Sequence, residues 1–119
     1  MLLQNGTPRM VGGTPESFWQ VQTNLQLITN IIDLGMPVQA AIDAPRWTMG
    51  SQTSLTDASL SLEGRFGEAV TRSLKECGHT VESIGDWAAG GAAQVIDVED
   101  GMLAGGGDPR TGTGSFIGY

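Results

Sequence analysis

The sequence predicts a single α+β domain covering residues 1–119. Three observations indicate this class: apolar residues recur at helical spacing in two segments, strand-like segments meet at Asn-Gly and Asp-Gly turns, and the length suits one core. The predicted order is a β-hairpin, two helices, strands, a helix and three strands, which indicates an α+β layer arrangement. No internal repeat or linker between domains is found in the sequence.

The first elements are a β-hairpin and a long helix. Strands are expected at residues 1–3 and 8–11, because Asn5-Gly6 readily adopts the positive φ angles of a hairpin turn. A loop at residues 12–17 follows. Val21, Leu25, Ile28 and Ile32 then recur at helical spacing as far as Gly35, and glycine suits the left-handed position after a helix.

The middle of the chain predicts a short helix and then extended segments. Pro37 suits a first helical turn, because its missing N–H would be unpaired there, and Ala44-Pro45 ends the helix after Ile42. Residues 47–62 are rich in Ser and Thr. Leu55, Leu60 and Leu62 suggest strands there with one buried face.

The last third predicts a helix followed by three strands. Phe66, Val70, Leu74 and Cys77 form an apolar stripe on a helix that Gly78 closes, and a strand is expected at residues 80–84. Strands at 93–98 and 102–104 are joined by the hairpin signal Glu99-Asp100-Gly101. The remaining residues predict an irregular tail.

Composition excludes several classes of function. The formal net charge of -7 opposes binding to nucleic acid and to anionic membrane surfaces. Cys77 is the only cysteine, so no disulfide can form within the chain, and we expect it to fill a core position. No Cys/His cluster has zinc-site spacing, so the sequence predicts no metal and implies no cofactor. With 39% hydrophobic residues and 18 glycines, the chain is expected to rely on a partner for part of its stability.

Four segments are candidates for a chemical role. His79 follows a helix stop and is expected to face solvent or cap the helix, and glycines 105–107 lack the lysine and spacing of a phosphate loop. Asp97, Glu99 and Asp100 are interpreted as a solvated hairpin end, because calcium-loop spacing is absent. The strand, loop and helix at residues 8–21 is the best candidate, because N–H groups before a helix favour an anion or a developing oxyanion.

The order of several short motifs resembles the small-subunit end of gamma-glutamyltransferases. The motifs are Gly13-Thr14-Pro15, Gly35-Met36, Asp43-Ala44-Pro45-Arg46, Gly78-His79, Asp108-Pro109-Arg110 and Gly118-Tyr119. The resemblance spans nearly the whole chain. It implies part of an N-terminal-nucleophile hydrolase αββα sandwich, incomplete in this segment, from a proenzyme that cleaves itself into a large and a small subunit.

The resemblance also implies the chemistry. The N-terminal threonine of the small subunit would lie upstream of Met1 and attack a gamma-glutamyl amide such as that of glutathione. No catalytic residue is then expected in this segment, which alone should be inactive. The upstream part of the small subunit and the large subunit are the expected partners, and many family members are periplasmic or extracellular.

The proposed oxyanion and substrate loop is formed by Gly13, Thr14, Pro15, Glu16 and Ser17. The family pattern at this loop is Gly-Ser/Thr-Pro-Gly-Gly, so Glu16 and Ser17 replace two glycines whose N–H groups would bind the oxyanion. Glycine allows φ angles and a close approach that these residues make more difficult. A related amidohydrolase or acylase with another substrate is therefore the alternative, and a noncatalytic scaffold or interaction domain is a second one.

Two arginines could bind a substrate carboxylate through paired hydrogen bonds, Arg46 and Arg110. In the family that the chain resembles, their motifs look structural, and we expect Arg46, Asp108 and Arg110 to form a structural motif. Unpaired strand edges, left where absent segments would pack, also predict association of copies of this chain.

Overall fold

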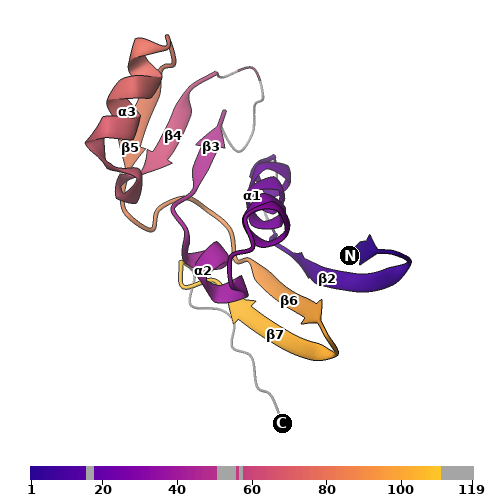
Figure 1. Ribbon diagram of the computed structural model, residues 1–119. Helices are drawn as coiled ribbons and strands as arrows, with labels where there is room; N and C mark the ends of the chain where they lie inside the picture. The colour runs from indigo at the N-terminus through magenta and orange to yellow at the C-terminus, as the bar shows by residue number, and fades with distance from the viewer. Residues whose placement is uncertain (16–17, 51–55, 57, 111–119) are drawn as a thin grey trace.

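The computed structural model describes residues 1–15, 18–50, 56 and 58–110. In this part of the chain, the strands form two separate sheets, and helices lie beside them (Figure 1). The α+β class is therefore confirmed. None of the described helices is long and apolar enough to cross a membrane.

The larger sheet has four antiparallel strands, which contain both predicted hairpins. They are β1 (Leu2–Gln4), β2 (Thr7–Gly13), β6 (Gln94–Glu99) and β7 (Met102–Gly107), in the spatial order β1-β2-β6-β7. Asn5 and Asp100 have positive φ angles of 52° and 51°, and a glycine with positive φ follows each. These angles are those of a tight hairpin turn, so the two turn predictions are confirmed.

Two helical segments pack beside this sheet and form the main core with it (Figure 1). Helix α1 (Trp19–Ile28) continues into a π-helical turn, η1 (Thr29–Asp33), and α2 (Val38–Asp43) follows. Gly35 has a φ of +64°, as predicted for a helix stop. The buried core comprises Met10, Leu27, Ile31, Val38, Ala41, Ile42, Ala93 and Val95.

The predicted helix forms, but its buried face differs from the one that the apolar spacing marks. Val21 and Leu25 are 74% and 56% exposed, whereas Thr23 and Leu27 are almost fully buried. The reason is that α1 lies between two partners. Leu27 packs into the main core, and the carboxamides of Gln22 and Gln26 bind the neighbouring strand β3 (Trp47–Met49).

The smaller sheet contains β3, β4 (Leu60–Glu63) and β5 (Val81–Ile84) in that order. Strands β3 and β4 are antiparallel, while β4 and β5 are parallel, joined by the short η2 (Gly64–Phe66) and helix α3 (Gly67–Glu76). Leu60 and Leu62 are buried, as predicted; Leu55 lies outside the described residues.

The expectation that Cys77 fills the core is wrong, because its side chain is exposed. Helix α3 has no buried residue, and Val70 is 40% exposed. The helix therefore carries an apolar stripe that the described residues cover only in part. Cys77 lies at its end, where Gly78 turns the chain away with a φ of +93°.

Candidate active-site loop

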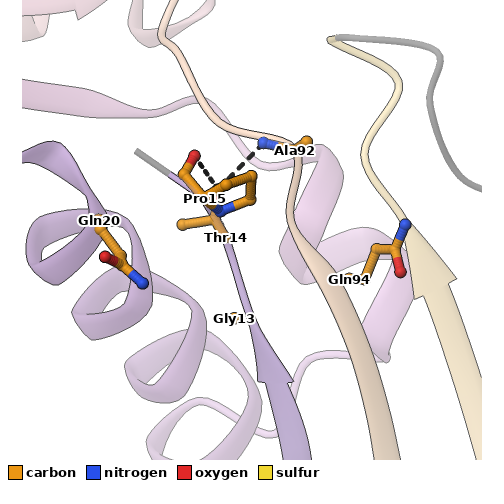
Figure 2. A pocket seen from close by; sticks show the side chains of 6 residues that line it. All are labelled: Gly13, Thr14, Pro15, Gln20, Ala92 and Gln94. Atoms are coloured by element: carbon orange, nitrogen blue, oxygen red, sulfur yellow. Dashed lines mark hydrogen bonds between the residues drawn. The ribbon is translucent and has the colours of Figure 1, made fainter. Parts of the chain in front are cut away.

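The end of strand β2 lines a cavity of about 500 Å³. Its lining residues are Gly13, Thr14, Pro15, Gln20, Ala92 and Gln94 (Figure 2). Three of them, Gly13, Thr14 and Pro15, belong to the loop predicted from sequence. The other two loop residues, Glu16 and Ser17, lie outside the described part of the chain.

Thr14 fixes the position of this loop. Thr14 is only 3% exposed, and its hydroxyl oxygen accepts a hydrogen bond of 3.0 Å from the N–H of Ala92. The same hydroxyl donates to the carbonyl oxygen of Pro15 at 3.4 Å (Figure 2). One side chain thus ties the end of β2 to the segment that leads into β6.

The glycine before the loop allows two strands to approach closely. A Cβ atom on Gly12 would lie 2.6 Å from the carbonyl oxygen of Gln94 and 2.9 Å from a methyl group of Val95. Only glycine avoids this clash with the partner backbone. The next residue, Gly13, lies opposite Gln94 in the β2–β6 register, so the strand ends place both at the cavity.

The two arginines predicted to be structural lie in a buried cluster of charged groups instead of the cavity lining. Arg46 bonds Asp108 at 2.6 Å, and Arg110 bonds Glu63 at 2.7 Å and Asp108 at 3.2 Å. Arg65 adds a third guanidinium, 2.7 Å from Glu63. We call Arg46, Glu63, Arg65, Asp108 and Arg110 the charge cluster.

An aromatic ring covers one side of the charge cluster. The guanidinium of Arg65 lies 3.5 Å from the ring centre of Trp87, and that of Arg110 lies 5.2 Å away. Both distances are within the range of a cation–π interaction. The ring therefore compensates some of the positive charge that three guanidinium groups leave beside two carboxylates.

The cluster favours the charged forms of Glu63 and Arg110 despite their burial. Burial would raise the pKa of Glu63, but hydrogen bonds from Arg110, from the N–H of Arg46 and from Arg65 hold that pKa below its ordinary value. Burial likewise opposes the charge on Arg110, yet the bond to Glu63 raises its pKa. Burial, together with the positive charge of Arg110, lowers the pKa of Arg46.

The charge cluster also holds the segment that forms one wall of the cavity. Ala89 donates its N–H to Glu63 at 3.2 Å, Ala93 donates to Asp108 at 3.0 Å, and Arg46 donates to the carbonyl oxygen of Gly90 at 3.4 Å. Ala92, between these anchored residues, is the one that binds Thr14. The cluster and the loop are thus linked through one short stretch of backbone.

Other sequence candidates lie away from this cavity. His79 is exposed, as expected. Glycines 105–107 form the end of strand β7, so the rejected phosphate-loop interpretation has no structural support. The interpretation of Asp97 as part of a solvated hairpin end is wrong, because Asp97 is 8% exposed and forms an ion pair with Arg9, whereas Glu99 is exposed.

Sequence reasoning missed five residues of the cavity lining and the charge cluster: Gln20, Glu63, Arg65, Ala92 and Gln94. Glu63 had a signal, since it directly follows the predicted buried leucines of β4 and should then itself lie near the core. The glutamines carried none, because an exposed glutamine is common on any helix or strand.

Comparison with known proteins identifies the family. The family model described as gamma-glutamyltranspeptidase matches residues 1–117. The chain belongs to the gamma-glutamyltranspeptidase family. The resemblance drawn from the short motifs is therefore confirmed.

Two relatives indicate how varied gamma-glutamyltranspeptidase homologues are. The chain is 39% identical over 120 residues to the glutathione hydrolase-like YwrD proenzyme of Bacillus subtilis (strain 168), covering 99% of this chain and 23% of that protein. It is also 39% identical over 112 residues to the oxamate amidohydrolase proenzyme of Klebsiella pneumoniae, covering 92% of this chain and 21% of that protein. The chain thus spans less than a quarter of the length of either relative.

A solved structure confirms the fold. An acivicin-inhibited gamma-glutamyltranspeptidase superposes with a TM-score of 0.77 at 28% identity, covering 93% of this chain and 58% of that one. The fold of this chain is therefore part of the N-terminal-nucleophile hydrolase fold of gamma-glutamyltranspeptidases, and the rest of that fold lies outside it.

Proposed function

We propose that the protein to which this chain belongs hydrolyses or transfers gamma-glutamyl groups of glutathione-like amides, and that the chain is the C-terminal part of its small subunit. The observation that carries the proposal is the position of Gly13, Thr14 and Pro15 on a cavity of about 500 Å³ in a member of this family. In the acivicin-inhibited relative, the C-terminus has critical roles in autoprocessing and catalysis. A C-terminal segment can therefore contribute to this chemistry.

In this proposal the nucleophile is an N-terminal threonine outside this segment. Its hydroxyl oxygen would bond to the carbonyl carbon of the substrate amide, and the C–N bond would break as the amine leaves with a proton. Water or an acceptor amine would then release the acyl group from the resulting ester. The present segment would contribute the loop that stabilises the oxyanion, and alone it would be inactive.

The charge of Glu16 opposes the proposed oxyanion site. Glu16 places a carboxylate directly after Pro15, and a carboxylate beside a developing oxyanion raises the energy of the transition state. Replacing Glu16 and Ser17 by glycine restores the family pattern. If the loop binds the oxyanion, kcat for a gamma-glutamyl anilide should rise in Glu16→Gly and Ser17→Gly.

The test compares full-length wild-type protein and these variants on a gamma-glutamyl anilide and on amides with other acyl groups. Turnover of the gamma-glutamyl anilide supports the proposal. If the protein ignores that anilide and cleaves another amide, the substrate assignment is wrong while the nucleophile chemistry stands. A full-length sequence without a threonine that autoprocessing could expose would remove the catalytic proposal altogether.

A second candidate function is that of an amidohydrolase acting on another acyl group. The identity of 39% to the oxamate amidohydrolase proenzyme equals that to the glutathione hydrolase-like protein and so favours neither. The substitutions at Glu16 and Ser17 favour a changed substrate. The comparison of acyl groups above distinguishes the two candidates.

A noncatalytic scaffold or interaction role is the remaining alternative. Such a role requires an exposed surface that a partner can cover. Val11, Ile96 and Leu103 are exposed apolar residues on β2, β6 and β7. We propose that the missing parts of the small and large subunits cover such surfaces and that, without them, copies of this chain associate. Light scattering of the 119-residue chain should detect dimers or larger species; a monomer at all concentrations would contradict this.

A further inference from the structure

Glutamine side chains bind backbone amides in one repeated way in this protein. In each case the carboxamide NH₂ donates to the carbonyl oxygen of a residue and its oxygen accepts from the N–H of that same residue. Gln22 binds Met49 at 2.8 and 2.7 Å, Gln26 binds Trp47 at 2.9 and 3.1 Å, and Gln39 binds Gly107 at 3.0 and 3.1 Å. A free carboxamide can therefore recognise an amide group of an extended chain by both its donor and its acceptor.

Two other glutamines line the cavity at the candidate loop, Gln20 and Gln94. Both residues are exposed, and their carboxamides form no hydrogen bond with any residue that the structure describes. Figure 2 shows them on opposite sides of the Gly13–Pro15 segment, Gln20 from α1 and Gln94 from β6. Their donors and acceptors are thus available to a ligand in the cavity.

The rest of the described lining is uncharged, and Glu16 of the same loop lies outside the described residues. Gly13, Thr14, Pro15 and Ala92 carry no ionisable side chain, and the hydroxyl of Thr14 already has protein partners. The lining that the structure describes therefore provides no charge to bind a carboxylate or an ammonium group. A volume of about 500 Å³ falls within the range of small-molecule sites and accommodates a group of dipeptide size.

We infer that Gln20 and Gln94 are specificity residues that bind a second amide group of the substrate, located on the amine side of the bond that is cleaved. The inference rests on the proposed function, because a glutathione-like substrate carries such an amide within its leaving dipeptide. It goes further because the two glutamines would favour substrates with a peptide-like leaving group over substrates whose leaving group has no amide. The two glutamines act in binding and take no part in the chemical step.

The test uses full-length protein and two substrates that share the gamma-glutamyl group. One is an amide with a dipeptide leaving group, and the other is an anilide. The variants are Gln20→Met, Gln94→Met and the double variant, since methionine keeps the side-chain length but forms no comparable hydrogen bonds. The matched control is Gln4→Met, on the exposed strand β1 outside the cavity lining. In the double variant KM for the dipeptide amide should rise about tenfold, as expected for losing two neutral hydrogen bonds.

The anilide separates this inference from a structural role. Its kcat/KM should stay within about twofold of the wild-type value in all variants, because it lacks the second amide. An equal loss on both substrates, or an unchanged ratio between them, would overturn the inference and leave the proposed function intact. Failure of wild-type protein to cleave either substrate would remove the proposed function and this inference with it.

Discussion

The guanidinium of Arg110 bonds both carboxylate oxygens of Glu63, with two distances of 2.7 Å between residues that lie 47 positions apart in the chain. Both side chains are at most 1% exposed. Such a two-point contact is among the stronger interactions between charged side chains, and it closes the tail of the described chain onto strand β4.

Removing the charge of Glu63 should destabilise the protein strongly. Glu63→Gln keeps the shape but leaves the buried guanidinium of Arg110 and the partly exposed one of Arg65 without this carboxylate. Breaking a buried ion pair in this way costs about 3–5 kcal/mol. Urea unfolding measures the loss, and Glu82→Gln, an exposed glutamate on β5, is the matched control with an expected change below about 0.5 kcal/mol. A similar small change in both variants would contradict the structural role of the cluster.

Stability should fall in acid because of the same residue. The pKa of Glu63 in the folded protein lies below its ordinary value of 4.5, so the unfolded chain binds the proton more tightly. The contribution of Glu63 is therefore present above pH 4.5 and is lost as pH falls through the lowered pKa. Unfolding free energies measured from pH 6 downward should show a smaller decrease in Glu63→Gln than in wild type. Parallel curves would assign the acid sensitivity to other groups.

A buried hydroxyl in α1 offers a stabilising substitution. The hydroxyl of Thr23 is fully buried and has no hydrogen-bond partner among the described residues, so it carries an uncompensated desolvation cost. Thr23→Val, nearly equal in shape, should raise the unfolding free energy by about 1 kcal/mol. Thr71→Val in α3 is the control, because its hydroxyl bonds the carbonyl oxygen of Gly67 at 3.2 Å and gains nothing from removal. A destabilised Thr23→Val would mean that this hydroxyl has a partner in the intact protein.

The contact between α2 and β7 requires a glycine. A Cβ atom on Gly106 would lie 2.8 Å from both Ile42 and Val38, which are buried core residues. Gly106→Ala should therefore cost about 1–3 kcal/mol through overpacking. At Gly85 the nearest atom, the Cβ of Ala88, lies at an ordinary 3.4 Å, so Gly85→Ala should change stability by less than about 0.5 kcal/mol. Thermal unfolding of the two variants compares them directly, and equal midpoints would contradict this packing of α2 against β7.

Much of the fold could be predicted from local signals. The turns at Asn5-Gly6 and Asp100-Gly101 and the stops at Gly35 and Gly78 depend on backbone angles that few residues adopt, so the sequence reveals them directly. The buried face of α1 could not be predicted in this way. It depends on Gln22 and Gln26 binding β3, a contact between distant segments that makes a polar flank face the protein.

The candidate site likewise could be predicted only where its residues are neighbours in the sequence. Gly13, Thr14 and Pro15 form one continuous motif, and the structure places them together on a cavity. Gln20 and Gln94 join them only because β2 pairs with β6 and α1 starts nearby, which no local pattern reveals. The structural interpretation of Arg46 and Arg110 agrees with their burial against Asp108 and Glu63.

The charge cluster unites residues from positions 46, 63 and 65 with residues from positions 108 and 110. During synthesis on the ribosome, the earlier three emerge long before their last two partners. Until Asp108 and Arg110 have emerged, Arg46 and Glu63 would be costly to bury, so we expect this region of the nascent chain to stay hydrated. We therefore expect a product truncated before Asp108 to form its hairpins but to leave its two sheets unjoined at this cluster. The apolar surface left exposed would make such a product prone to aggregation.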